Sequence, residues 1–91
     1  MPAQILAVGS TDANSGDVTV GEGEQLTVSL KDAAGPFIAT GARVEIQLKD
    51  DAAQYFTVDT LNAGKSSVVI AGAGTYRFKR RGGTACGVFS G

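Results

Sequence analysis

The densest group of ionisable side chains is a basic run near the end of the chain. The segment Arg77-Phe78-Lys79-Arg80-Arg81 holds half of the eight basic residues, and aromatic residues alternate with its charges. Rings in such a run can stack on nucleic-acid bases, and cations can bind an acidic protein surface. With a strand period of two, Tyr76 and Phe78 share the core face, and Arg77 and Lys79 share the other face. The run therefore predicts a basic strand edge that either solubilises the sheet or docks an acidic partner protein, and nucleic acid is the least favoured partner.

Two acidic segments have residue types that bind cations or transfer protons. Asp12-x-Asn14-x-Gly16-Asp17 places oxygen ligands on alternate residues, as a calcium loop does. The bidentate acidic ligand that an EF-hand needs is missing at the required spacing, so we interpret the segment as an Asx-rich turn. Asp50 and Asp51 are adjacent, and adjacent strand residues point to opposite faces. They indicate a solvated hairpin tip rather than a convergent carboxylate pair.

Nucleophilic and metal chemistry is limited by the residue types present. The chain has no histidine, so a Ser-His-Asp or Cys-His nucleophilic site is excluded. The single cysteine, Cys86, can form neither an internal disulfide nor a Cys/His zinc site, and we expect it to be a small buried hydrophobe. With no activated nucleophile, the sequence predicts a protein that is not an enzyme and that holds no metal or cofactor.

Length, composition and charge indicate one small soluble domain over residues 1–91. The chain is 43% hydrophobic and 19% charged, with a formal net charge of -1. This charge argues against nucleic acid as the main partner. No apolar run is long enough to span a membrane, and the first residues lack the basic region of a signal peptide. A domain of this size has a limited core, so docking or oligomer formation is expected to add stability.

Apolar and polar residues alternate in several short runs, as they do in half-buried strands. The clearest runs are Gln25–Leu30 and Arg43–Lys49, and in the second run Val44, Ile46 and Leu48 are predicted to face inward. Further strand candidates lie at 5–8, 56–59, 68–70, 76–79 and 86–89, separated by turns rich in Gly, Asn and Asp. The pattern predicts an all-β fold, a single small antiparallel β-sandwich of about seven or eight short strands with a short N-terminal arm.

From residue 21 onward the order of these features resembles a known group of proteins. The features are Gly21-Glu22-Gly23-Glu24 before a polar strand, the charged strand Arg43–Lys49, an aromatic strand after Asp50-Asp51, the segment Gly74-Thr75-Tyr76-Arg77-Phe78, and the final segment 83–88. This layout resembles the small immunoglobulin-like or β-sandwich virion proteins of tailed bacteriophages, which include capsid decoration (cement) proteins. The tryptophan that these proteins usually carry after the acidic turn is absent here, so Tyr55 or Phe56 is expected in its place.

The resemblance implies a non-enzymatic protein that docks on a phage capsid and stabilises the shell. It implies that the protein is made in the host cytoplasm and lies on the capsid exterior, against the major capsid protein or other virion proteins, with a homo-oligomer as a further option. The expected contact elements are Met1–Ala7, the Arg77–Arg81 strand and the C-terminal Val88-Phe89-Ser90-Gly91. If Cys86 and Val88 face the core, Phe89 faces outward and can anchor an interface.

Two alternatives stay open: a tail accessory protein, and a β-sandwich module that binds a carbohydrate or a host surface. A groove with exposed aromatic rings beside polar side chains would favour the carbohydrate-binding module. The chain has only six aromatic residues and no tryptophan. Most of the six are expected to be buried, which disfavours that module.

Overall fold

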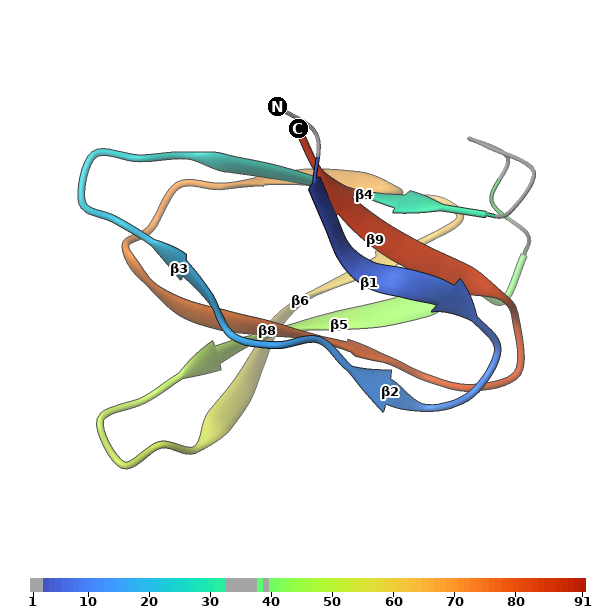
Figure 1. Ribbon diagram of the computed structural model, residues 1–91, viewed down its shortest axis with the longest axis horizontal. Coiled ribbons are helices and arrows are strands. Elements are labelled where there is room, and N and C mark those ends of the chain that lie inside the picture. Colours follow the sequence, from blue (N-terminus) through green and yellow to red (C-terminus); the bar gives the residue numbers. More distant parts are fainter. Residues whose placement is uncertain (1–2, 33–37, 39) are drawn as a thin grey trace.

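Two antiparallel sheets pack face to face in the computed structural model, which describes residues 3–32, 38 and 40–91 (Figure 1). These residues form nine strands and contain no helix, hence none that could cross a membrane. The strands are β1 (Ala3–Gly9), β2 (Ala13–Asn14), β3 (Val18–Val20), β4 (Leu26–Lys31), β5 (Arg43–Lys49), β6 (Tyr55–Asn62), β7 (Ser67–Ile70), β8 (Gly74–Arg80) and β9 (Cys86–Ser90). The predicted all-β sandwich is confirmed.

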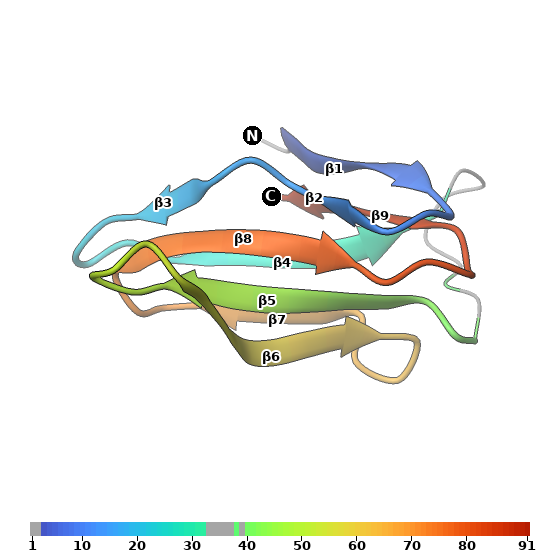
Figure 2. The same cartoon turned by 90° about the horizontal axis from the view of Figure 1, so that it is seen from below.

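Successive strands cross repeatedly from one sheet to the other. The first sheet has the order β1-β9-β4-β7, and the second has the order β2-β8-β5-β6 with β3 also paired to β8 (Figure 2). This is the order of a double-sheet jelly roll in which β2 and β3 together form one interrupted edge strand. An immunoglobulin sandwich keeps its last two strands in one sheet, whereas here β8 and β9 lie in different sheets. The immunoglobulin-like topology implied by the resemblance is therefore wrong, although the sandwich architecture is right.

The core lies between the two sheets and comes from the inward positions of the central strands. Val44 and Ile46 on β5, Val28 on β4 and Phe78 on β8 are almost completely buried. Each of these residues alternates with a polar neighbour that faces away from the core, as a half-buried strand requires. The face assignments predicted for β4, β5 and β8 are confirmed at these positions.

Strand β6 does not bury the apolar residues of its first half. Phe56 and Val58 alternate with Thr57 and Asp59, but each of the two apolar residues is 53% exposed. The pairing with β5 contains a bulge, because Ile46 lies opposite Asp59 while the next residue along β5 lies opposite Thr57. The residue in between, Val58, has no partner, so the inside–outside alternation is interrupted there. Tyr55 and Phe56, the two residues expected in place of the tryptophan of these virion proteins, lie outside the core, Tyr55 on the outer surface and Phe56 exposed.

The first described residues belong to a sheet rather than to a separate arm. Met1 and Pro2 lie outside the described residues, and Ala3 already pairs with Ser90 of β9. Strand β1 is the edge strand of its sheet, and its start lies beside the end of β9 (Figure 1). The N-terminal arm expected up to Ala7 is therefore part of a strand from Ala3 onward.

Candidate functional site

The outer face of the β2-β8-β5-β6 sheet gathers five of the eight basic side chains. We call this surface the cationic face; its basic residues are Arg43, Lys49, Arg77, Lys79 and Arg81. They come together because β5 and β8 are neighbours and both turn their apolar residues toward the core. Of the predicted group Arg77, Lys79, Arg80 and Arg81, all but Arg80 lie on this face, and two residues of β5 join them. Their outward position was predicted, but the pairing of β5 with β8 was not.

A nearly buried carboxylate organises one end of the cationic face. The Glu45 side chain is 8% exposed and accepts two hydrogen bonds from Arg81, Nε to Oε2 at 3.1 Å and Nη2 to Oε1 at 3.0 Å. Thr57 Oγ1 donates to Glu45 Oε1 at 3.3 Å, and Arg43 Nη2 lies 3.5 Å from Oε2. These Arg81 hydrogen bonds lower the pKa of Glu45 against the opposing effect of desolvation.

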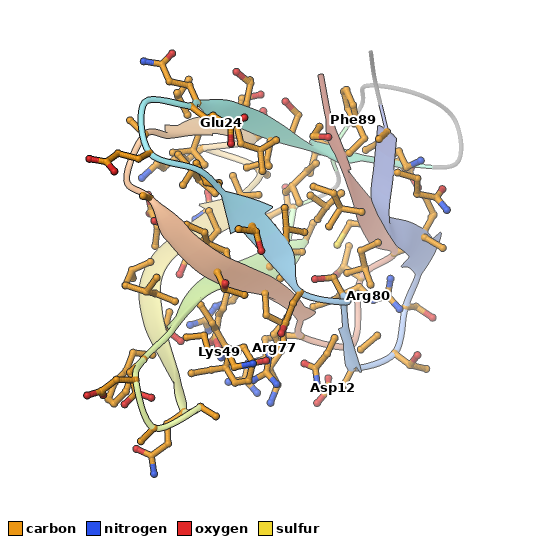
Figure 3. All side chains as sticks on the ribbon, turned by 60° about the vertical axis from the view of Figure 1, so that its left-hand side comes forward. Asp12, Glu24, Lys49, Arg77, Arg80 and Phe89 are labelled. Atoms are coloured by element: carbon orange, nitrogen blue, oxygen red, sulfur yellow. The ribbon has the colours of Figure 1, made fainter. Side chains whose placement is uncertain are left out.

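An aromatic ring and a second carboxylate organise the other end. The Arg77 guanidinium lies 3.7 Å from the centre of the Tyr55 ring and donates to Gln47 Oε1 from Nε at 3.0 Å and Nη2 at 2.6 Å. The Tyr55 hydroxyl donates to Asp17 at 2.7 Å, and Lys49 Nζ lies 3.2 Å from the same carboxylate. The hydrogen bond to Asp17 raises the pKa of Tyr55. Lys49 and Arg77 lie close together on this side of the molecule, away from Phe89 (Figure 3).

Arg80 does not belong to this surface, and β8 is not an edge strand. Arg80 is only 5% exposed and donates hydrogen bonds to the carbonyl oxygens of Thr11, Ala7 and Cys86. Strand β8 lies inside its sheet, between β5 and the β2/β3 edge. The expectation of an exposed Arg80 on a basic strand edge is therefore wrong. The strand period could have predicted this burial, because Arg80 lies two residues after the buried Phe78 and therefore faces the same side of the sheet.

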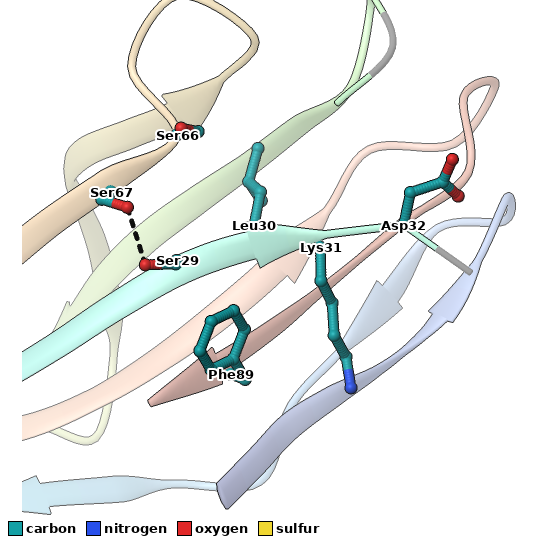
Figure 4. A pocket seen from close by; sticks show the side chains of 7 residues that line it. All are labelled: Ser29, Leu30, Lys31, Asp32, Ser66, Ser67 and Phe89. Atoms are coloured by element: carbon teal, nitrogen blue, oxygen red, sulfur yellow. Dashed lines mark hydrogen bonds between the residues drawn. The ribbon is translucent and has the colours of Figure 1, made fainter. Parts of the chain in front are cut away.

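Phe89 lies on the opposite sheet and faces outward, as predicted. Cys86 and Val88 are fully buried, whereas Phe89 is half-buried outside the core. Its ring borders a shallow hollow of about 440 Å³ that also includes the hydroxyl pair Ser29–Ser67, whose oxygens are 2.7 Å apart (Figure 4). Ser29 is the direct cross-strand neighbour of Phe89. The structure thus places an aromatic ring beside polar side chains.

The aromatic residues are less buried than expected. Among those that the structure describes, only Tyr76 and Phe78 are buried. Tyr55 and Phe89 are half-buried on outer faces, and Phe56 is exposed. The expectation that most of the aromatic residues are buried is wrong for the described part of the chain, because the start of β6 and the outward side of β9 hold three of them outside the core.

The remaining sequence candidates have structural roles. The Asp12 carboxylate accepts a hydrogen bond from the Gly82 N–H, and the Asp50 carboxylate accepts two from the following hairpin turn, as expected of turn residues. Cys86 is buried, as predicted, and desolvation raises the pKa of its thiol. Within the described ranges, no group of three or more acidic or cysteine side chains is placed to hold a metal ion.

Replacing Glu45 with glutamine is expected to lower the free energy of unfolding at about pH 7 by about 1–3 kcal/mol, because Arg81 loses a charged acceptor. The pKa of Glu45 is lower in the folded than in the unfolded chain, so its charged form stabilises the fold above the unfolded pKa. That contribution disappears as the pH falls through the folded pKa. The difference between wild type and Glu45→Gln should therefore shrink as the pH falls below about 4.3, the ordinary pKa of glutamate, and disappear once Glu45 is protonated in the folded chain.

Urea unfolding of both proteins across this pH range measures the difference. Asp17 and Asp59 also have lowered pKa values, but they are present in both proteins and cancel. A difference that stays constant with pH would contradict the role assigned to the Glu45 charge.

Comparison with known proteins identifies a similar fold. No protein-family model matches the chain, and no curated protein matches it. Among solved structures, the crystal structure of the SPBc2 prophage-derived protein YomS is similar, with a TM-score of 0.70 and 10% sequence identity. The similarity covers 99% of this chain and 88% of that one. At this identity the similarity shows a shared fold alone.

Proposed function

We propose that this chain is a non-enzymatic structural protein of a phage particle, which docks on the capsid exterior as a decoration protein and stabilises the shell. The observation that carries the proposal is the similarity of nearly the whole chain to a prophage-derived protein. Jelly rolls also recur in viral capsid domains, which supports the proposal at the level of the fold. The partner is the major capsid protein or another virion protein.

The cationic face supplies a surface suited to such docking. Hydrogen bonds and ring contacts already fix Arg77 and Arg81, so these side chains lose little conformational freedom when a partner binds. A protein that binds only the assembled shell stabilises the shell by mass action. Stabilisation of the shell therefore requires neither a conformational change nor a catalysed reaction in this chain.

Co-sedimentation of the purified protein with assembled capsids of the phage that encodes it tests this function. The expected result is saturable binding at a fixed stoichiometry and a higher rupture temperature of the decorated shell. Isolated tails serve as the parallel sample, because binding to tails alone would identify a tail accessory protein. A folded protein that binds neither particle would contradict the proposal.

The hollow beside Phe89 favours a second candidate, a module that binds a carbohydrate on a host surface. An aromatic ring next to the Ser29 and Ser67 hydroxyls can stack on a sugar ring while the hydroxyls form hydrogen bonds to it. This is the combination that distinguishes a carbohydrate site from a plain sheet surface. Glycan-array binding by the wild-type protein, in the absence of capsid binding, would favour this candidate over the first.

Replacing Phe89 with alanine separates docking from folding. The ring is half-buried and lies outside the core, so the thermal midpoint of the isolated domain is expected to change by no more than a few degrees. Binding of whichever partner covers the hollow should weaken by about tenfold or more. A large fall in the midpoint, measured by circular dichroism, would show that Phe89 is part of the core.

A further inference from the structure

Positive charge is unevenly balanced on the cationic face. At the end formed by Lys49 and Arg77, the cations are held by Asp17, Gln47 and the Tyr55 ring. At the other end, Arg43, Lys79 and Arg81 surround the Glu45 carboxylate, and the Asp12 carboxylate also interacts electrostatically with Arg81. The second end therefore has more positive than negative charge, in a chain whose net charge is -1.

The donors at this second end are only partly used. Arg81 occupies both oxygens of Glu45, which leaves Arg43 a single long contact of 3.5 Å, and the Arg43 side chain is 57% exposed. Lys79 lies directly opposite Glu45 in the β5–β8 pairing and has no side-chain partner in the part of the chain that the structure describes. Arg43 and Lys79 thus have donors available to an incoming acceptor at one end of the sheet.

The shape beside Arg43 also suits a protruding side chain. A hollow of about 330 Å³ lies between the turn that precedes β5 and the turn that follows β6. Its lining includes Arg43, Thr40 and Gly64. An acidic side chain that enters this hollow comes within reach of the Arg43 guanidinium, which can bind a carboxylate through two parallel hydrogen bonds.

We infer that Arg43, Lys79 and Arg81 form a docking site for the carboxylate-rich surface of a protein partner. The inference deepens the proposed function and rests on it, since the partner is then an acidic patch of a virion protein. Charge complementarity carries the choice of partner. A nucleic acid fits this end less well, because the Tyr55 ring lies at the other end of the cationic face and is covered by Arg77, so it offers no stacking surface beside Arg43 and Lys79.

The test compares two variants that remove the same charge from different surfaces. Arg43→Gln/Lys79→Gln removes the two cations with available donors, and Lys31→Gln/Lys65→Gln removes two cations outside the cationic face. Arg81 stays unchanged, because its loss would leave the Glu45 carboxylate without its main partner. Thermal midpoints of both variants are measured first, to establish that they fold.

In capsid co-sedimentation, the first variant is expected to bind about tenfold more weakly than wild type, and the second to stay within about twofold. Binding of the wild type should weaken as salt is raised. If wild type binds capsids and both variants bind equally well, the docking site is wrong while the proposed function stands. If the second variant loses more affinity than the first, docking uses the surface around Lys31 or Lys65 instead, and the inference is again wrong.

A second measurement decides the inference even if wild type does not bind capsids, which would contradict the proposed function. A glutamate oligopeptide and a single-stranded DNA of equal charge are titrated into the wild-type protein at low salt. Binding of the peptide that is lost in Arg43→Gln/Lys79→Gln supports the site. Preference for the DNA, or binding of neither, overturns it.

Discussion

Replacing Arg80 with alanine is expected to lower the free energy of unfolding by about 3–5 kcal/mol, because one buried and two part-buried carbonyl groups lose their donor at about 1–3 kcal/mol each. The Arg80 Nε–H donates to the Thr11 oxygen at 2.7 Å, and Nη1 donates to Ala7 at 2.7 Å and Cys86 at 3.0 Å. These carbonyls belong to the β1–β2 connection, to β1 and to β9. One side chain of the second sheet therefore ties together strands of the first.

Urea unfolding of Arg80→Ala measures this effect, and two variants control it. Lys79→Ala truncates the neighbouring cation on the outer face and should cost no more than about 0.5 kcal/mol. Arg80→Lys should recover only part of the loss, because an ammonium group cannot reproduce the planar spread of guanidinium donors. Equal losses for Arg80→Ala and Lys79→Ala would show that the buried hydrogen bonds contribute little.

Replacing Phe78 with alanine should lower the free energy of unfolding by a similar amount, about 3–5 kcal/mol. Phe78 is among the largest fully buried side chains, and its removal leaves a cavity between the sheets. Its backbone N–H donates to Ser15 Oγ at 2.9 Å and its carbonyl accepts from the Ser15 N–H at 2.8 Å; alanine keeps both groups, so the expected loss comes from the missing ring.

Phe78→Leu is the matched control, because it keeps most of the apolar volume and should cost less than half as much. Denaturant unfolding monitored by far-ultraviolet circular dichroism measures both variants. A Phe78→Ala protein that loses less than about 1 kcal/mol would show that the sheets close over the missing ring.

The parts of the fold that the sequence predicts best are the central strands. The predicted limits Arg43–Lys49 coincide with β5, and its inward residues are those of the core. In a strand with neighbours on both sides, each side chain meets either the core or solvent, so the period of two is preserved. The outward position of Phe89 on β9, which also lies between two strands, follows from the same rule.

The parts that the sequence could not predict depend on long-range pairing. Nothing local distinguishes a jelly roll from an immunoglobulin sandwich, since both consist of short alternating strands and differ in which strands pair. The bulge at Val58 arises from the register between β5 and β6. Arg80 was predicted to be exposed because arginine is charged. In the alternation of β8 it nevertheless occupies an inward position, where backbone carbonyls accept hydrogen bonds from its guanidinium.

The candidate site was predicted in part for the same reason. Arg77, Lys79, Arg80 and Arg81 lie within five successive residues and were predicted as a group, of which the buried Arg80 is not part of the site. Arg43 reaches the site only because β5 lies beside β8. Glu45, the carboxylate that holds Arg81, shares the outward parity of Arg43, but no sequence pattern predicted which cations would surround it.

The pairing of Ala3 with Ser90 means that anything fused to either terminus emerges from one corner of the molecule. That corner belongs to the β1-β9-β4-β7 sheet, whereas the cationic face is the outer surface of the other sheet. A fluorescent reporter or an affinity handle attached there leaves Arg43 and Lys79 uncovered. Inserting the domain into a loop of a carrier protein through its two termini would likewise leave the cationic face pointing away from the carrier.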